Sequence, residues 1–242
     1  MKIIFLGTRG YIDAKTKLHY RHTSTLIEYK KTKVIIDCGI DWIEKIHKIK
    51  KDAILITHAH PDHAFGLQNG IDCKVYATKE SWKTLDKFNI EKKYKKIIYP
   101  RKKIKIGSLI IEAFQVIHSI RAPAIGYKIT AGKVTIFYVP DLIKIKQQKA
   151  ALKNVALYIG DGATINRPII RRKNGQLFGH TTISAQVGWC KKEKVPRAIF
   201  THCGSQIVEG DRRKIFALIN AIALKHNIKT SIAHDGLELA LI

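Results

Sequence analysis

The stretch AILITHAHPDHAFG, residues 53–66, places three histidines and one aspartate directly after a short apolar run. Residues 53–57 have the composition of a buried strand, and Pro61 suits the first position of a following helix. The segment that leaves the strand carries His58, His60, Asp62 and His63. Imidazole nitrogens suit zinc and similar ions, and a carboxylate adds a harder ligand. His58 and His60, which are separated by one residue, can hold one ion. Asp62 and His63 are then left for a second ion.

Short apolar runs rich in β-branched and aromatic residues predict strands along the whole chain. These runs lie at residues 2–6, 24–29, 33–37, 53–57, 73–77, 109–116, 125–130, 133–139, 155–160, 197–201 and 237–241. Apolar residues at helical spacing predict helices at 79–88, 182–194 and 211–225, the first with Thr78 as its N-cap. The strands come in runs, and the helices fall late in each half. This order favours two sheets with helices outside them over a simple βαβ alternation.

The length and composition favour a single domain that covers residues 1–242. The chain has 242 residues, 45% of them hydrophobic, which is enough to bury a core without disulfide or metal staples. It has no apolar run of the ~18 residues that a membrane span needs, and its start lacks the apolar centre of a signal peptide. The cysteines form no C-x-x-C pair. We therefore expect reduced thiols and a cytoplasmic protein without membrane association.

The net charge of +25, from 44 Lys and Arg against 19 Asp and Glu, is strongly basic. Such a field attracts polyanions such as nucleic acid. An AT-rich genome or adaptation to heat would give the same bias toward lysine and isoleucine, so both explanations stay open. A dense basic stretch at 92–105 is expected to be a solvated face. A second one just before His180 is expected to contact phosphate through Arg167, Arg171 and Arg172.

Several motifs resemble the metallo-β-lactamase-fold hydrolases. THAHPDH (57–63) is similar to the H-x-H-x-D-H signature of that family, and VIIDCG (34–39) is similar to its strand that ends in Asp-x-Gly. GHTTIS (179–184), IFTHCGS (199–205) and AHDGLEL (233–239) resemble the phosphodiesterase branch, which includes ribonuclease Z and the phosphoribosyl cyclic phosphodiesterases. The resemblance covers nearly the whole chain. It implies an α/β fold, a four-layer αββα sandwich of two mixed β-sheets flanked by helices.

The resemblance also implies a site for two divalent metal ions. Zinc is expected, and manganese or iron would also fit a site of histidines and aspartates. The ligands would be His58, His60 and His118 for the first ion, Asp62, His63 and His202 for the second, and Asp141 as the bridge. Some family members place the third histidine in a Gly-His-Thr context, so His180 competes with His118. An aspartate that closes a strand follows His118 but not His180, which favours His118. Pro140-Asp141 replaces the usual Gly-Asp, a small departure.

The implied activity is hydrolysis by a hydroxide shared between the two ions, with Asp62 and His180 as catalytic residues. A phosphodiesterase or nuclease acting on RNA or DNA is the leading hypothesis, and such relatives often form homodimers. A hydrolase of a lactone, β-lactam or thioester is the alternative, and a non-catalytic nucleic-acid-binding module is the third. Asp161 would orient a metal-bound histidine or shape its turn. His234 would support the site or belong to a plain loop. The resemblance does not assign the substrate of either relative to this chain. The sequence lacks an insertion like the flexible tRNA-gripping arm of ribonuclease Z, and it lacks the clustered N-terminal cysteines of some cyclic phosphodiesterases.

Overall fold

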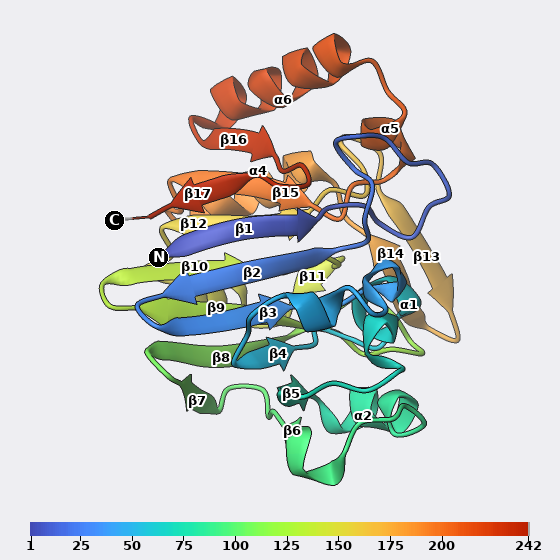
Figure 1. Cartoon of the computed structure of the whole chain (residues 1–242). Helices are drawn as coiled ribbons and strands as arrows, with labels where there is room; N and C mark the ends of the chain where they lie inside the picture. Colours follow the sequence, from blue (N-terminus) through green and yellow to red (C-terminus); the bar gives the residue numbers. More distant parts are fainter. Residues whose placement is uncertain (242) are drawn as a thin grey trace.

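The computed structural model describes residues 1–241 and contains two large β-sheets that face each other (Figure 1). The first sheet has the order β17-β1-β2-β3-β4-β5-β6. Its strands are β1 (Lys2–Gly7), β2 (Ser24–Tyr29), β3 (Thr32–Ile36), β4 (Ala53–Leu55), β5 (Lys74–Ala77), β6 (Lys95–Ile97) and β17 (Glu238–Ala240). Both sheets are mixed: β1, β2 and β3 pair antiparallel, whereas β3, β4, β5 and β6 pair parallel.

The second sheet has the order β11-β8-β9-β10-β12-β15-β16, and β7 pairs with β8. Its strands are β7 (Lys103–Ile106), β8 (Leu109–Ile117), β9 (Ile125–Ala131), β10 (Val134–Tyr138), β11 (Lys144–Ile145), β12 (Leu157–Asp161), β15 (Arg197–Thr201) and β16 (Lys229–Ile232). The helices are α1 (Pro61–Ala64), α2 (Lys79–Leu85), α3 (Gln148–Leu152), α4 (Ile183–Lys192), α5 (Ser205–Val208) and α6 (Arg212–His226). Short 3₁₀ turns lie at Ile40–Trp42, Ile46–Lys48, Phe65–Leu67 and Lys92–Tyr94.

Alternation along the strands creates the layers. Val34 and Ile36 of β3 pack between the two sheets, whereas Ile35 packs on the outer side with Trp42 and Trp82. Successive strand residues point to opposite faces, so a strand covered on both sides needs apolar residues at both sets of positions. In the second sheet, helices α4 and α6 cover the outer face next to β15 and β16 (Figure 1). The expected αββα sandwich of two mixed sheets is confirmed.

The residues predicted to begin helices are confirmed in that role. Thr78 accepts a hydrogen bond from Ser81 N–H as the N-cap of α2, and Pro61 opens α1. Asp211 caps α6, which ends where Asn227 adopts a left-handed conformation. Strands β6, β7, β11 and β16 of the two large sheets were not predicted. Each contains at least one lysine, which suits an exposed edge strand but hides the apolar pattern.

A separate hairpin was also not predicted. Strands β13 (Ile169–Lys173) and β14 (Gln176–His180) pair only with each other and form a two-stranded sheet outside the two large ones. Asn174 and Gly175 form the turn with φ values of 48° and 74°. Asn-Gly with positive φ at both positions is the favoured two-residue hairpin turn. Among residues 1–241, no helix is both long and apolar enough to cross a membrane.

Candidate active site

The site lies at one end of the sandwich, on the right of Figure 1, where α1, α5, β13 and β14 come together. Most of its side chains follow the last residue of a strand. His58 follows β4, His118 follows β8, Asp141 follows β10, and His202 follows β15, while His180 closes β14. Strands whose carboxyl ends meet at one edge bring distant residues together. The order of the strands in the sheets therefore brings these residues together, although they are far apart in the sequence.

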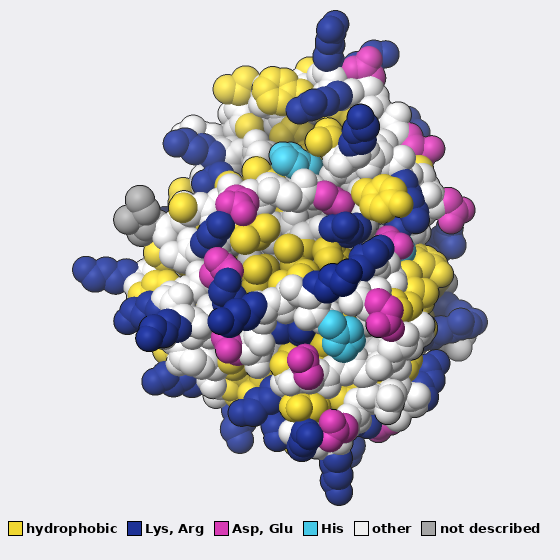
Figure 2. All heavy atoms as spheres, in the orientation of Figure 1, with side chains coloured by type: hydrophobic (Ala, Val, Ile, Leu, Met, Phe, Trp, Pro, Cys, Tyr) yellow, Lys and Arg dark blue, Asp and Glu magenta, His cyan; other side chains and the backbone are white. Residues whose placement is uncertain are grey.

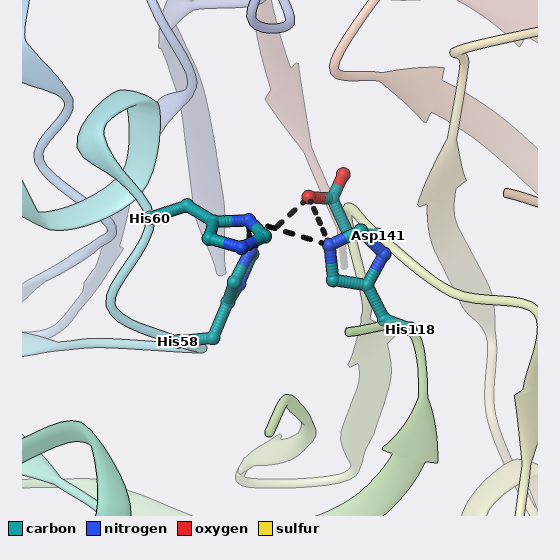
Figure 3. Close-up of side chains that lie close together, drawn as sticks. All are labelled: His58, His60, His118 and Asp141. Atoms are coloured by element: carbon teal, nitrogen blue, oxygen red, sulfur yellow. Dashed lines mark hydrogen bonds and ion pairs between the residues drawn. The ribbon is translucent and has the colours of Figure 1, made fainter. Parts of the chain in front are cut away.

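The first group of side chains consists of His58, His60, His118 and Asp141 (Figure 3). Asp141 Oδ2 lies 3.3 Å from Nε2 of His58 and 3.3 Å from Nε2 of His118. His60 Nδ1 lies 2.9 Å from His58 Nε2 and 3.5 Å from His118 Nε2. In the close-up, the imidazoles and the carboxylate point toward a common centre from separate segments of the chain.

The second group consists of Asp62, His63 and His202, and it also meets Asp141. His63 Nε2 lies 3.2 Å from Asp62 Oδ2 and 3.1 Å from Asp141 Oδ2. His202 Nε2 lies 3.0 Å from Asp62 Oδ2, and its Nδ1 lies 2.7 Å from Asp141 Oδ1. Asp141 is thus common to both groups, and all seven side chains expected to be ligands lie together.

The polar atoms of this centre fit metal ions better than they fit one another. His63 Nε2, His202 Nδ1 and Asp141 Oδ1 are buried and make no hydrogen bond of acceptable geometry, although charged atoms lie within reach of each. Buried polar atoms without partners are costly unless a ligand satisfies them. Imidazole nitrogens together with carboxylate oxygens are a donor set for divalent transition metals. The residues therefore suit divalent cations.

Burial and charge divide the histidines into two kinds. Burial lowers the pKa of His58 well below its usual value and lowers the pKa of His118 to about 4, so both are neutral. Burial also opposes the charged form of His63 and His202, but the neighbouring carboxylates outweigh it and raise both pKa values well above normal. A neutral imidazole is ready to bind a metal, whereas a charged one must first lose its proton.

The carboxylates of the centre are ionised. Burial alone would raise the pKa of Asp141 and of Asp62, but the surrounding histidines lower both values well below the usual range. For Asp141 the main opposing partner is His202, and for Asp62 it is His63. The two buried carboxylates are thus balanced by charged imidazoles, whose protons a bound divalent cation would displace.

Asp37 supports the centre, although no site role was predicted for it. Its Oδ2 lies 2.8 Å from His63 Nδ1 and accepts a hydrogen bond from the Thr57 hydroxyl, while its Oδ1 accepts one from the backbone N–H of Thr57. A carboxylate on the far nitrogen fixes the orientation of an imidazole and leaves Nε2 for a metal. Asp37 and His202 both have left-handed backbones, with φ of 61° and 53°. Strained residues of this kind cluster at functional sites. The signal in the sequence was the strand-ending aspartate of VIIDCG.

Asp161 contacts His180, which is not one of the expected metal ligands, and it also shapes its own turn. Its Oδ2 lies 2.8 Å from His180 Nδ1, and its Oδ1 accepts a hydrogen bond from the backbone of Ala163 in the turn. Burial lowers the pKa of His180, but Asp161 outweighs this effect, and the net pKa lies above normal. His180 lies 3.9 Å from Asp141 Oδ1, farther than His118, so the geometry groups His118 with the first cluster.

A cavity of about 620 Å³ opens onto the centre. Its walls include His60, Asp62, His118, Asp141, His180 and His202, together with Tyr11 and Ile12 from the loop after β1 and Ile169 from β13. His234 lies elsewhere, in the wall of a different cavity beside His19, and its Nδ1 contacts the backbone oxygen of Asp235. Arg167 is exposed in the loop before β13, and its backbone oxygen accepts a hydrogen bond from Thr164.

A family model described as a β-lactamase superfamily domain matches residues 32–203 of the chain. Ribonuclease Z from Methanopyrus kandleri strain AV19 is 31% identical over 147 residues, which cover 54% of this chain and 50% of that protein. The match therefore spans about half the length of that relative.

Solved structures with the same fold include Zn²⁺-bound PqqB from Methylobacterium extorquens, with a TM-score of 0.77 at 15% identity over 100% of both chains. The short form of human tRNase Z has a TM-score of 0.66 at 16% identity, again over 100% of both chains. At this identity the two likenesses show the fold alone.

The fold and the matched segment together define the class of protein: a β-lactamase superfamily domain built on a two-sheet sandwich, with a cluster of histidines and aspartates that suits divalent cations. The matched segment runs from the start of β3 to the residue after His202 and so contains the whole candidate centre. The chain belongs to the β-lactamase superfamily, with the metallo-β-lactamase fold.

Proposed function

We propose that this protein is a metal-dependent hydrolase, namely a phosphodiesterase that uses two metal ions. The observation that carries the proposal is Asp141, which reaches both groups of ligands. Its Oδ2 lies 3.3 Å from Nε2 of His58, and its Oδ1 lies 2.7 Å from Nδ1 of His202. A carboxylate between two sets of nitrogen ligands is placed to bridge two cations. In the proposal, zinc is the expected metal, and manganese or iron suits the same donors.

The seven side chains have fixed places in this proposal. The first ion is held by His58, His60 and His118, the second by Asp62, His63 and His202, and Asp141 is shared. Two bound divalent cations supply Lewis-acid chemistry, because they lower the pKa of water toward ~7 and neutralise charge on the attacking and leaving oxygens of a phosphodiester. The neutral imidazoles of His58 and His118 and the ionised carboxylates are already in their binding forms.

His180 has the catalytic role that the cavity best supports. Asp161 holds its Nδ1 at 2.8 Å, which leaves Nε2 for substrate in the cavity. Because Asp161 also raises the pKa of His180, the ring can donate a proton to the leaving oxygen or stabilise negative charge on the phosphate. Asp62 orients its neighbours, since its carboxylate lies within 3.2 Å of His63 and 3.0 Å of His202.

Nucleic acid is the proposed source of the phosphodiester. The net charge of +25 favours a polyanion, and the partial likeness to ribonuclease Z points the same way. Figure 2 shows Lys and Arg side chains spread over the visible face, so the charge there attracts broadly and does not by itself mark one binding surface. The four free cysteines, all buried, fit a reducing compartment, and we place the protein in the cytoplasm.

A second activity is favoured by one observation, the apolar part of the cavity wall. Tyr11, Ile12 and Ile169 line the cavity beside the centre. Such a wall suits a lactone, β-lactam or thioester better than it suits a bare phosphate, because these substrates carry less charge. The net positive charge of the chain favours an anionic substrate, so phosphodiester hydrolysis is the activity that we propose first.

The test combines metal analysis with three substrates. We expect two divalent ions per chain and turnover of bis(p-nitrophenyl) phosphate that exceeds turnover of nitrocefin or of a lactone. His63→Ala should lose metal and activity, whereas His47→Ala, a change at an exposed histidine, should keep both. Lactone turnover without phosphodiester turnover would favour the second activity. Tight, salt-sensitive RNA binding without turnover of any substrate would favour a non-catalytic binding module.

A further inference from the structure

The hairpin β13–β14 presents one of its two faces to the candidate active site. Ile169 and His180 are opposite each other in the hairpin, and both line the cavity. Residues two apart on a strand point to the same face, and residues directly opposite share a face as well. The cavity face of the hairpin therefore continues away from the site through Arg171 opposite Phe178, and then through Lys173 opposite Gln176.

The same alternation separates two arginines that are adjacent in the sequence. Arg172 is opposite Leu177, and Ile170 is opposite Gly179. These residues form the other face of the hairpin, whereas the two hairpin residues that line the cavity, Ile169 and His180, belong to the first face. Of the two neighbouring arginines expected to contact phosphate, only Arg171 lies on the cavity face. The register of the hairpin, which the sequence does not give by itself, makes this distinction.

The cationic side chains on the cavity face are free to bind an anion. Every residue of β13 is exposed. Within residues 1–241, the side chains of Arg171 and Lys173 make no salt bridge and no hydrogen bond. Phe178 is half-buried and lies on the same face, directly opposite Arg171. An aromatic ring flanked by unpaired cations suits an unpaired base and its backbone phosphates.

The hairpin is also fixed to the centre. The backbone N–H of Gly179 donates to the backbone oxygen of His118 at 2.8 Å, and His118 Nδ1 lies 3.1 Å from the backbone oxygen of Gly179. Gly179 has φ of +120°, and a Cβ there would lie 1.8 Å from the backbone oxygen of Ile169. Only glycine fits this joint. A strand of substrate on the hairpin would therefore enter the cavity in a defined direction.

We propose that Arg171, Lys173, Gln176 and Phe178, the hairpin track, bind a single-stranded polynucleotide next to the phosphodiester that is cleaved. The proposal rests on the proposed phosphodiesterase function and adds the form of the substrate. Phe178 stacks on a base, which requires an unpaired nucleotide, while Arg171 and Lys173 contact phosphates. Arg172, on the opposite face, does not take part.

The first test measures binding by the metal-loaded protein. The probe is a fluorescein-labelled oligoadenylate of ~12 nucleotides, about the size that single-strand sites cover, with phosphorothioate linkages that resist cleavage. Arg171→Ala and Lys173→Ala should each weaken binding ~10-fold, and Phe178→Leu ~5-fold or more. Arg172→Ala is the matched control, with the same charge change one residue away, and should weaken binding less than ~2-fold. Equal effects of Arg171→Ala and Arg172→Ala would overturn the track, because they would reflect net charge alone.

The second test compares substrates. Arg171→Ala should lower kcat/KM for a single-stranded oligonucleotide ~10-fold more than it lowers kcat/KM for bis(p-nitrophenyl) phosphate, which is too small to extend from the cavity to the hairpin track. Equal losses on both substrates, or binding of duplex as tight as single strand, would overturn the proposal. If the unaltered protein does not hydrolyse bis(p-nitrophenyl) phosphate, the phosphodiesterase function fails, and the binding test still decides whether the track holds a polynucleotide.

Discussion

The candidate metal centre and the hairpin track lie next to each other, because the track continues the hairpin face that carries Ile169 and His180, yet the two are built in opposite ways. His58 and His63 are fully buried, Asp141 is 3% exposed, and their charges are balanced against one another. Arg171 and Lys173 are exposed and unpaired within residues 1–241. Chemistry needs side chains held in one geometry, whereas recognition of a flexible strand needs charges that are free to meet it. Changes in the centre should therefore stop the reaction, and changes in the track should alter which substrate is used.

Asp141→Ala should have the largest effect. It removes the carboxylate that both ligand groups share, and with it the main cause of the raised pKa of His202 and a contribution, second to that of Asp62, to the raised pKa of His63. We expect loss of at least one of two bound ions, measured by elemental analysis, and turnover of bis(p-nitrophenyl) phosphate at the background rate. Asp72→Ala, at a carboxylate that is 74% exposed, is the control. Full metal content with normal turnover in Asp141→Ala would rule out the bridging role.

Asp37→Asn tests how strongly metal binding depends on a residue that orients an expected ligand without being a ligand itself. The amide keeps the shape of the side chain, but it weakens the contact with His63 Nδ1, which is 2.8 Å long. Loss of such an orienting carboxylate costs about 10–100-fold in metal affinity or activity. A zinc competition assay with a chromogenic chelator measures the affinity. An unchanged affinity would show that Thr57 and the backbone alone hold His63 in place.

Gly179→Ala tests the joint between the two regions. An alanine Cβ would meet the backbone oxygen of Ile169, and φ of +120° is strained for any side chain. We expect the free energy of unfolding to fall by about 3 kcal/mol, measured by urea denaturation. Gly175→Ala is the matched control, because its φ is also positive (+74°) but nothing lies within 4 Å of its Cβ. That change should cost only about 1–2 kcal/mol. Equal losses at the two positions would mean that the backbone at Gly179 can move away from Ile169 to accommodate a side chain, so that close packing does not require glycine at this joint.

The centre and the hairpin also differ in how far the sequence predicts them. His58, His60, Asp62 and His63 are neighbours in the chain, so their clustering follows from local spacing. The meeting of His118, Asp141 and His202 depends on strand order, which no spacing along the chain determines, and it was expected only from resemblance. Asp37 was visible as a strand-ending aspartate, but its partner His63 follows from the parallel pairing of β3 with β4.

The hairpin was missed for a different reason. Asn174-Gly175 is a strong local turn signal, but the basic residues that precede it lack the apolar alternation by which strands are predicted. Even with the hairpin predicted, the sequence would not separate Arg171 from Arg172. That separation depends on which face carries Ile169 and His180 into the cavity, and the tertiary fold sets that face.

Asp161→Asn should have the smallest effect. It acts on His180, which closes strand β14 of the hairpin and lines the cavity beside the candidate centre. If protonated His180 assists the leaving oxygen, the rate falls as pH rises through its pKa. Asp161 now holds that pKa above normal against the opposing effect of burial, so the fall lies above pH ~6.5. Without the carboxylate, burial prevails, the pKa drops, and the fall moves to lower pH. A shift of about one pH unit would cost about 10-fold in rate at pH values above both pKa values and little below them. The pH profile of kcat for bis(p-nitrophenyl) phosphate measures the shift, and an equal loss of rate at every pH would instead assign Asp161 to the structure of the turn.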